Sequence, residues 1–299
     1  MKTIRDLGEF GLIHQLHRHL RPPDRSVHTG IGDDCAVLRS HDPKKFLLYT
    51  CDPVVEGIHF LPGTPPRQVG WKVMARNLSD IAAMSGIPRW AVVSLGLRPH
   101  TPVNYVTALY DGLQTAATKF GCQIVGGDTT HVRHEQFIVV ALLGEVERHR
   151  LTLRSGAKPG DIVFITGKLG GSRAGKHLTF TPRLREARWL TAHGRIHAMM
   201  DLSDGLASDL HRLAESSHVG FDIVSTQIPA TNTIRAALTD GEDFELLFTV
   251  SPQTATKLKA QWKFKLSLTE IGRVTHQPVV RLDGQPLTAT GYDHFAKRR

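Results

Sequence analysis

Five short segments rich in acidic residues recur along this sequence, and each also carries glycine, serine, threonine or asparagine. They span residues 30–34, 50–52, 77–80, 126–130 and 201–205. Four of them lie at or beside the ends of apolar runs that predict strands, where α/β folds place ligand sites. Oxygen-rich ligand sets of this kind suit Mg²⁺, which usually arrives with phosphates. The sequence therefore predicts a site for magnesium ions and phosphate groups.

The composition suits a globular protein of two domains and argues against several other classes. The 299 residues are 40% hydrophobic and 22% charged, without an apolar run near the ~20 residues of a membrane span. Residues 1–20 lack the apolar core of a signal peptide, and the three cysteines form no CxxC unit. We therefore expect a cytoplasmic protein with reduced thiols and no membrane partner. The formal net charge of +9 suggests nucleic-acid binding, but the basic residues are dispersed and no such motif is present, so we expect no nucleic-acid partner.

The first half of the chain predicts alternating strands and helices. Apolar runs predict strands at residues 45–50, 90–97, 122–125 and 137–146. Helical spacing of apolar residues predicts helices over residues 10–20, from Thr64 to Gly86, and over 103–120. A polar, basic stretch at 148–159 has the composition of a linker. We therefore expect an N-terminal domain at residues 1–148 and a C-terminal domain at 149–299.

The second half predicts a further sheet with glycine-rich turns. A strand at 161–166 leads into a turn at 167–171 that has the composition of a phosphate loop but not the GxxxxGK[ST] spacing. Asp204 is expected to cap the next helix, whose free N–H groups suit an anion near Ser203. Asp283 and Gly284 predict a hairpin.

Nine segments, in family order, resemble the thiamine-monophosphate kinases, a family in the superfamily that includes aminoimidazole ribonucleotide synthetase. They are GIGDDCAVL from residue 30, CDPVVEGIHF from 51, NLSDIAAMSG from 77, GGDTT from 126, RSGAKPGD from 154, TGKLGGSRAG from 166, DLSDGLASDL from 201, GEDFELLF from 241 and GYDHF from 291. The resemblance implies an α+β fold of two domains, each a mixed sheet with packed helices. It also implies a homodimer, formed through the N-terminal domain, which binds metal and ATP, while the C-terminal domain completes the site.

The activity implied by this resemblance is the transfer of a phosphoryl group from ATP to thiamine monophosphate, assisted by several Mg²⁺ ions. The acceptor phosphate is mostly dianionic at neutral pH, because its second pKa is about 6. It therefore needs no protein base, in line with a sequence that shows no Ser-His-Asp or Cys-His arrangement. Two other readings stay open: another ATP-using synthetase of the superfamily, and a non-catalytic protein that binds nucleotides or nucleic acid.

Matching motif positions imply the roles of individual residues. The implied metal ligands are Asp34, Thr50, Cys51, Asp52, Asp80, Asp128, Asp201 and Asp204. Among these, the expected catalytic residues are Asp34, Asp52, Asp128 and Asp204. The implied nucleotide contacts are Gly127, Asp128, Arg154 and Ser203, and the implied acceptor contacts are His59, Glu242 and Tyr292. Asp33 is expected to serve the turn or to support its neighbour.

The chain departs from the family pattern at a few positions around this site. Cys51 stands where threonine is common, so a backbone carbonyl is expected to replace the hydroxyl ligand. Gly171 replaces a common aspartate, Asp240 replaces a common glycine, and the stretch 175–181 is shorter than usual. These departures concern the rim of the site and bear on substrate preference.

Overall fold

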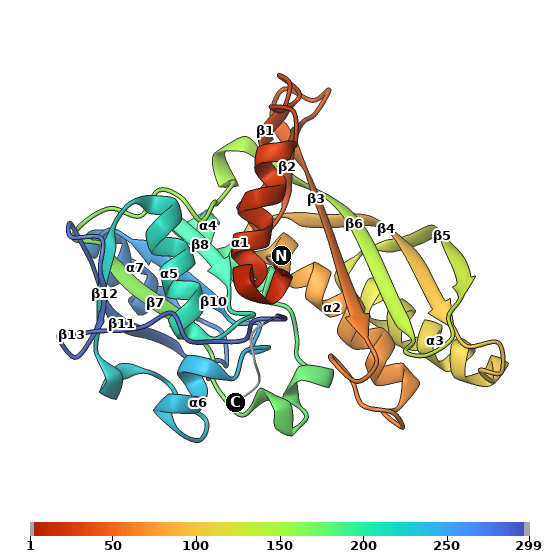
Figure 1. Cartoon of the computed structure of the whole chain (residues 1–299). Helices are drawn as coiled ribbons and strands as arrows, with labels where there is room; N and C mark the ends of the chain where they lie inside the picture. The colour runs from red at the N-terminus through yellow and green to blue at the C-terminus, as the bar shows by residue number, and fades with distance from the viewer. Residues whose placement is uncertain (1–2, 296–299) are drawn as a thin grey trace.

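A mixed sheet built from residues 27–147 forms one half of the computed structural model, which describes residues 3–295 (Figure 1). Its strands, in spatial order, are β1 (Val27–Thr29), β2 (Ala36–Arg39), β3 (Lys45–Val55), β6 (Phe137–Glu147), β4 (Ile87–Leu97) and β5 (Gln123–His131). Only β4 and β5 pair in parallel, and the other neighbours are antiparallel. β5 therefore forms one edge of this sheet.

A second mixed sheet, built from residues 162–286, forms the other half. Its strands, in spatial order, are β13 (Gln285–Pro286), β12 (Val280–Leu282), β9 (Gly220–Ile223), β11 (Leu268–Thr275), β7 (Ile162–Thr166), β10 (Leu246–Val250) and β8 (Ala198–Asp201). β9 and β12 pair in parallel, and the other neighbours are antiparallel. Two mixed sheets with packed helices confirm the predicted fold class, while the domain boundary at residue 148 stays a prediction.

The helices differ in how much of their surface they bury. They are α1 (Ile4–His19), α2 (Pro66–Ala83), α3 (Val103–Phe120), α4 (Leu184–His193), α5 (Leu206–Ser217), α6 (Ile234–Thr239) and α7 (Pro252–Gln261). Short 3₁₀ turns are η1 (Arg148–Arg150), η2 (Ser172–Ala174), η3 (Lys176–Leu178) and η4 (Ser225–Gln227). α1 contains no buried residue, whereas most of α2 is buried. Within residues 3–295, no helix is long and apolar enough to cross a membrane.

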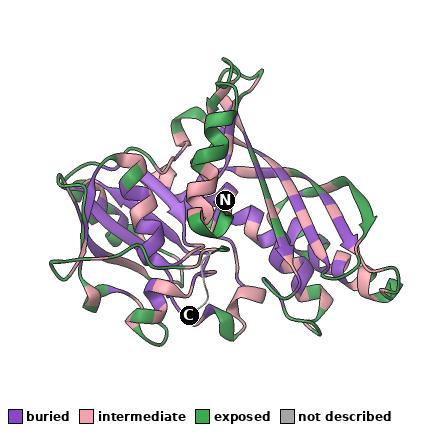
Figure 2. Ribbon diagram, in the orientation of Figure 1, coloured by how far each residue is buried: buried purple, intermediate pink, exposed green. Residues whose placement is uncertain are grey.

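The first sheet has one covered face and one open face. Strand side chains alternate between faces, and Leu48, Val93 and Val140 are buried on the face that packs against α2. On the opposite face, Tyr49 and Trp90 are 47% and 45% exposed. Figure 2 shows how buried and less buried residues alternate along the strands of this sheet. α2 and α3 cover the inner face closely because glycine occupies their crossing point: a Cβ on Gly70 would lie 2.0 Å from a backbone oxygen of α3.

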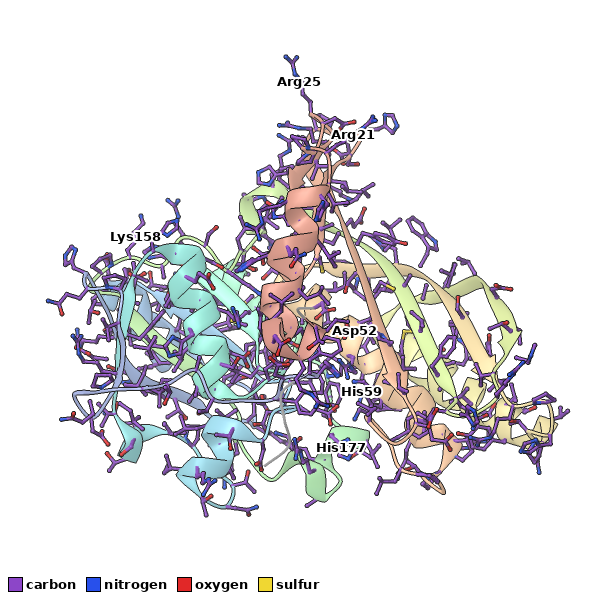
Figure 3. The ribbon with its side chains drawn as sticks, in the orientation of Figure 1. Arg21, Arg25, Asp52, His59, Lys158 and His177 are labelled. Carbon is purple, nitrogen blue, oxygen red and sulfur yellow. The ribbon has the colours of Figure 1, made fainter. Side chains whose placement is uncertain are left out.

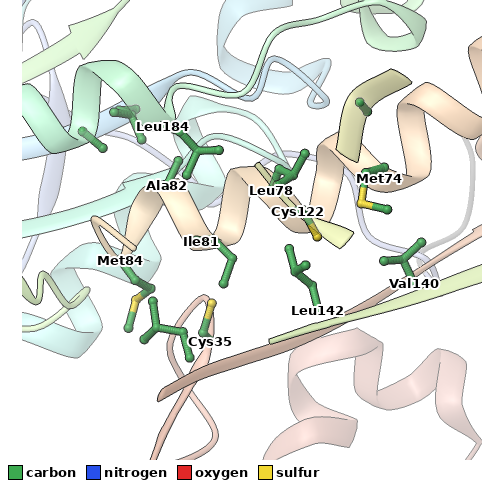
Figure 4. Packing of buried hydrophobic residues seen from close by; sticks show 14 of the residues in the cluster. Cys35, Met74, Leu78, Ile81, Ala82, Met84, Cys122, Val140, Leu142 and Leu184 are labelled. Carbon is green, nitrogen blue, oxygen red and sulfur yellow. The ribbon is translucent and has the colours of Figure 1, made fainter. Parts of the chain in front are cut away.

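α2 lies between the two halves and shares their core. In Figure 4, Ile81 and Met84 face Leu142 and Cys35 of the first domain, while Leu184 of α4 approaches Ala82. All six of these residues belong to a single buried cluster that includes residues of both sheets. Burying a side chain of this size stabilises the fold by roughly 1.5–3 kcal/mol. The two halves are therefore held in place through α2.

Three local predictions differ from the structure. β3 and β5 run further than expected, so Asp52 and Asp128 lie inside strands and not at strand ends. The reason is pairing: β6 matches β3 over its full length, so the ladder continues past Asp52. Asp204 does not cap α5, because Gly205 occupies the N-cap position and no side chain caps the helix.

The hairpin at Asp283 and Gly284 is confirmed, with both residues at positive φ.

Replacing Glu147 by glutamine should weaken the link between β6 and α4. Arg188 donates two hydrogen bonds to the Glu147 carboxylate, at 2.5 and 2.8 Å. These bonds, against the effect of burial, lower the pKa of Glu147 to about 2 from 4.5. A lowered carboxyl pKa stabilises the fold above the unfolded value and loses this effect as pH falls towards the folded value. We expect a loss of about 1 kcal/mol at pH 7 for this half-buried pair, fading between about pH 4.5 and 2.

Urea unfolding of the wild type and of Glu147→Gln at pH 7 and pH 3 measures this difference. The exposed Glu215, which pairs with Arg212 one turn earlier on α5, provides the control variant Glu215→Gln. A Glu147→Gln effect that is no larger than this control, or that stays constant down to pH 3, would contradict the expectation.

Candidate functional site

A cavity of about 1100 Å³ lies where the two halves meet, and residues from both sheets line it. Figure 3 shows Asp52, His59 and His177 in this region. Of the predicted site residues, the structure brings together Asp34, Thr50, Cys51, Asp52, His59, Asp80, Arg154, Asp201, Ser203, Asp204, Glu242 and Tyr292. The lining residues come from segments far apart in the sequence, so only the packing of the two halves assembles them.

Three carboxylates converge at the floor of this cavity. Asp34 precedes β2, Asp80 lies on α2 and Asp201 ends β8, and one oxygen of each lies within 4.8 Å of the others. Thr50 donates a hydrogen bond of 2.5 Å to Asp80, and Ser79 donates one of 2.5 Å to Asp201. The hydroxyl groups therefore orient two of the carboxylates.

The electrostatics of this cluster favour a bound cation. Burial, followed by the charge of Asp34, raises the pKa of Asp201 to about 7, and burial also raises the pKa of Asp80 well above its ordinary value. One oxygen of Asp34 is buried and makes no hydrogen bond. Carboxylates in such an arrangement repel one another, and a divalent cation among them would relieve the repulsion.

Arg154 lies beside the cluster and contacts both acids of the first motif. Its guanidinium donates hydrogen bonds of 2.5 and 3.2 Å to one oxygen of Asp34, and its backbone N–H donates to Asp33 at 3.1 Å. Burial, together with the charge of Asp34, raises the pKa of Asp33 to about 7. Asp33 thus ties the loop before β2 to the segment of Arg154, which agrees with the supporting role expected for it.

A second wall of the cavity carries aromatic and imidazole rings. His59 lies in the loop after β3, and its ring centroid is 5.2 Å from that of His294. Tyr292 meets His294 edge to face at 4.9 Å, and its backbone N–H donates a hydrogen bond to the Asp204 carbonyl at 2.9 Å. Burial, followed by the charge of Arg76, lowers the pKa of His59 to about 3. The ring of His59 is therefore neutral at physiological pH.

Glu242 faces the same wall from the second domain. Gly241 and Glu242 both have positive φ, 70° and 55°, and the Glu242 backbone N–H donates to the Ser203 carbonyl at 2.7 Å. A Cβ on Gly241 would lie 2.7 Å from that same carbonyl, so only glycine fits there. A positive φ at a non-glycine residue costs energy and is often retained at functional sites. This strained turn directs the Glu242 carboxylate into the cavity.

Two cations of α2 that the sequence analysis missed neutralise Glu242. Lys72 lies 2.6 Å and Arg76 lies 3.6 Å from one oxygen of Glu242, and Arg76 also donates to Asp52 at 3.2 Å. Although burial opposes ionisation, a contact with His177 and these two charges hold the pKa of Glu242 at about 2. Lys72, Arg76 and Asp80 are spaced at i, i+4 and i+8, which places them on one face of the helix. This shared face with the predicted ligand Asp80 could have identified the two cations from the sequence.

Asp209 of α5 was also missed. It lines the cavity, and one of its carboxylate oxygens is buried without a hydrogen-bond partner. The other oxygen accepts a hydrogen bond from the Asp204 backbone N–H at 3.3 Å. Burial, followed by the charge of Asp204, raises the pKa of Asp209 well above its ordinary value. Asp209 lies near the end of the motif that begins at residue 201, and its membership of that motif could have identified it as a site residue.

Gly127 and Asp128 do not line the cavity within the described chain. They lie on the exposed edge strand β5, and one Asp128 oxygen accepts a hydrogen bond from the next backbone N–H, of Thr129, at 2.8 Å. Their metal and nucleotide roles therefore stay predictions.

Two positions that depart from the family pattern contact each other. The backbone N–H of Gly171 donates a hydrogen bond of 3.0 Å to Asp240, and that of Gly170 donates to Asp243 at 2.9 Å. The glycine-rich turn is thus engaged by carboxylates of the chain itself, which agrees with its lack of phosphate-loop spacing. Cys51 is exposed and lines the cavity, so a thiol stands at the site's rim.

Comparison with known proteins agrees with this geometry. Residues 32–146 match the family "AIR synthase related protein, N-terminal domain", and residues 158–285 match its C-terminal domain. The thiamine-monophosphate kinases of Aquifex aeolicus and Bacillus subtilis are 35% and 34% identical to the chain, over 98% and 97% of it and 99% and 100% of their own lengths. The chain belongs to the thiamine-monophosphate kinase family.

Solved structures of thiamine-monophosphate kinases share this fold. AaThiL complexed with AMPPCP and TMP superposes with a TM-score of 0.87 at 35% identity, covering 98% of this chain and 99% of that one. Thiamine-monophosphate kinase from Stenotrophomonas maltophilia gives 0.76 at 30% identity, over 94% and 98%. The alignment with the Aquifex aeolicus kinase spans 325 positions, so that relative has residues that this 299-residue chain lacks.

Proposed function

We propose that the chain transfers the γ-phosphoryl group of ATP directly to thiamine monophosphate, which yields thiamine diphosphate and ADP. The observation that carries the proposal is one cavity with two chemically different parts: a cluster of carboxylates at its floor, and aromatic rings at one of its walls. The relative that was solved with AMPPCP and TMP supports the same pair of ligands.

The carboxylate cluster fits magnesium. Asp34, Asp80 and Asp201 offer oxygen ligands within 4.8 Å of one another, and Asp34 keeps a buried oxygen free of hydrogen bonds. Hard oxygen ligands of this type are the ones that Mg²⁺ prefers. When bound, such ions would neutralise the negative charge of donor and acceptor phosphates and so permit their approach. Asp52 and Asp204 line the same cavity and would complete the ligand sets.

The wall that carries the rings suits the organic part of the acceptor. Thiamine carries a positively charged heteroaromatic ring, which the rings of Tyr292 and His59 would contact. Because His59 stays neutral, it does not repel this cation. The acceptor phosphate is itself a nucleophile, so the residues of the chain would need only to hold both substrates in line and exclude water.

Turnover of ATP with and without thiamine monophosphate tests this function. We expect thiamine diphosphate and ADP in equal amounts, sequential kinetics, and no covalent label on protein incubated with γ-labelled ATP and Mg²⁺ alone. A competent phosphorylated enzyme would overturn direct transfer but leave the kinase assignment standing. ATP turnover that requires a different acceptor would favour another synthetase of the superfamily.

We further propose a homodimer in the cytoplasm, formed through the open face of the first sheet. Tyr49, Trp90, Val92 and Val125 are between 41% and 58% exposed, and Tyr49 and Cys51 also line the cavity. An apolar sheet face of this kind is typical of a protein–protein contact. A second copy seated there would lie against the rim of the cavity.

The sheet order supports a role for this second copy in the site. Asp52 lies opposite Val140, which lies opposite Val93, which in turn lies opposite Gly127. Three strand spacings therefore separate Asp52 from Gly127, roughly 14 Å. Mg²⁺ lies ~2.1 Å from each ligand oxygen, so Asp52 and Asp128 of one chain are too far apart to share an ion. We propose that Asp128 reaches the cavity of the partner copy.

A further inference from the structure

Lys72 is among the largest fully buried side chains in the part of the chain that the structure describes. It lies in the middle of α2, behind the wall of the cavity, and does not line it. Burying an ammonium group is costly unless every N–H finds an acceptor. Lys72 has three polar partners: its nitrogen donates a hydrogen bond of 2.6 Å to the His59 carbonyl oxygen, lies 2.7 Å from Nδ1 of His177 and forms an ion pair of 2.6 Å with a carboxylate oxygen of Glu242.

These three partners belong to three separate segments of the cavity wall. His59 comes from the loop after β3, His177 from η3, and Glu242 from the strained turn before β10. All three residues line the cavity. One buried ammonium group therefore connects a loop of the first domain to two loops of the second.

We propose that Lys72 is a positioning residue that sets the acceptor-binding wall of the cavity by fixing His59, His177 and Glu242 relative to one another. This inference rests on the proposed function, because it assigns that wall to thiamine monophosphate.

The neighbouring contacts indicate that no other group can take over this task. Arg76, one turn along α2, lies 3.6 Å from the same Glu242 oxygen but is already bound to Asp52. Trp71, which directly precedes Lys72, donates its ring N–H to the Phe180 carbonyl at 2.8 Å. Trp71 therefore contacts the chain just after η3 and not the three partners of Lys72. Without the ammonium group, Glu242 would keep only Arg76 and His177 as partners, and the His59 carbonyl would lose its donor.

Lys72→Met tests the proposal, because methionine keeps an unbranched side chain and removes only the charge and the donors. We expect KM for thiamine monophosphate to rise by about tenfold or more, equivalent to ~1.4 kcal/mol, and KM for ATP to change less than about twofold. Equilibrium binding of thiamine monophosphate without ATP should weaken by the same factor. The exposed Lys259, which pairs with Glu270, provides the control Lys259→Met, for which we expect no change.

The double variant Lys72→Met/Glu242→Gln separates positioning from stability. Lys72→Met leaves the buried Glu242 carboxylate short of a partner and should lower the melting temperature, whereas the double variant should recover most of this loss. If Lys72 acts through Glu242, the double variant should bind thiamine monophosphate no worse than Glu242→Gln alone. This variant also serves if Lys72→Met does not fold.

The outcomes distinguish this proposal from the proposed function. Equal changes in both KM values with a lower melting temperature, fully additive effects in the double variant, or unchanged constants would each overturn the role of Lys72 while the wild type still makes thiamine diphosphate. A wild type that neither binds nor phosphorylates thiamine monophosphate would overturn the proposed function, and this inference with it.

Discussion

We expect Asp80→Asn to lower kcat by ~100-fold or more while making the metal-free protein more stable. Asp80 is one of the three converging carboxylates, and asparagine removes a charged ligand but still accepts the hydrogen bond from Thr50. A 100-fold loss corresponds to about 2.7 kcal/mol of transition-state stabilisation. The gain in stability follows because burial and neighbouring aspartates raise the pKa of Asp80 well above 3.8.

The pH dependence of this gain gives a second measurement. A raised carboxyl pKa means that the folded state holds a proton that the unfolded state releases, so stability falls as pH rises above the unfolded value. Asparagine has no such proton. In the presence of a chelator, we expect Asp80→Asn to match the wild type near pH 4 and to exceed it by about 1–2 kcal/mol at pH 7.

The surface acid Asp111, which pairs with Arg67 outside the cavity, provides the control Asp111→Asn. Urea unfolding with a chelator and initial rates at saturating Mg²⁺ measure the two effects. Near-normal turnover of Asp80→Asn would remove Asp80 from the reaction, and a loss of stability at pH 7 would contradict the account of mutual repulsion.

The second large effect concerns Asp52 and Asp128. We expect Asp52→Asn and Asp128→Asn each to remove most activity and to leave folding nearly intact, because each removes one charged ligand. If Asp128 acts in the partner's cavity, a mixture of the two inactive variants should regain activity. In an equal mixture, half of the dimers contain one chain of each kind, and each of these has one complete site, which gives about a quarter of wild-type activity.

Co-expression of the two variants, followed by a turnover assay, measures this recovery. Mixing either variant with itself under the same conditions should give none. A lack of recovery with confirmed mixed dimers would place Asp128 outside the partner's site, and near-normal turnover of Asp128→Asn alone would remove it from the reaction. Sedimentation of the wild type checks that the dimer itself exists.

Much of the fold and of the site could be predicted from the sequence because both depend on local patterns. Apolar spacing identified the helix of Trp71 and Ile81, and Gly121 marked the end of α3, where it adopts the left-handed conformation. Asp34, Asp80 and Asp201 were identifiable because each stands in a short motif with small neighbours, and the structure brings them together. Strand lengths were less predictable, since the pairing of β3 with β6 extends β3 beyond its apolar core.

What the sequence alone determined is the family to which the chain belongs and a set of candidate site residues, marked by acids spaced among glycine, serine and threonine. Only the tertiary structure decided which of them meet. It placed Lys72 and Arg76 against Glu242, 170 and 166 positions further along the chain, and it left Asp128 on an exposed edge strand. The physical reason is that a charged side chain is stable in the interior only beside groups of opposite charge or hydrogen-bond partners. Here these partners come from distant segments, and the packing of the two halves around α2 brings them together. Local sequence patterns carry no information about that packing.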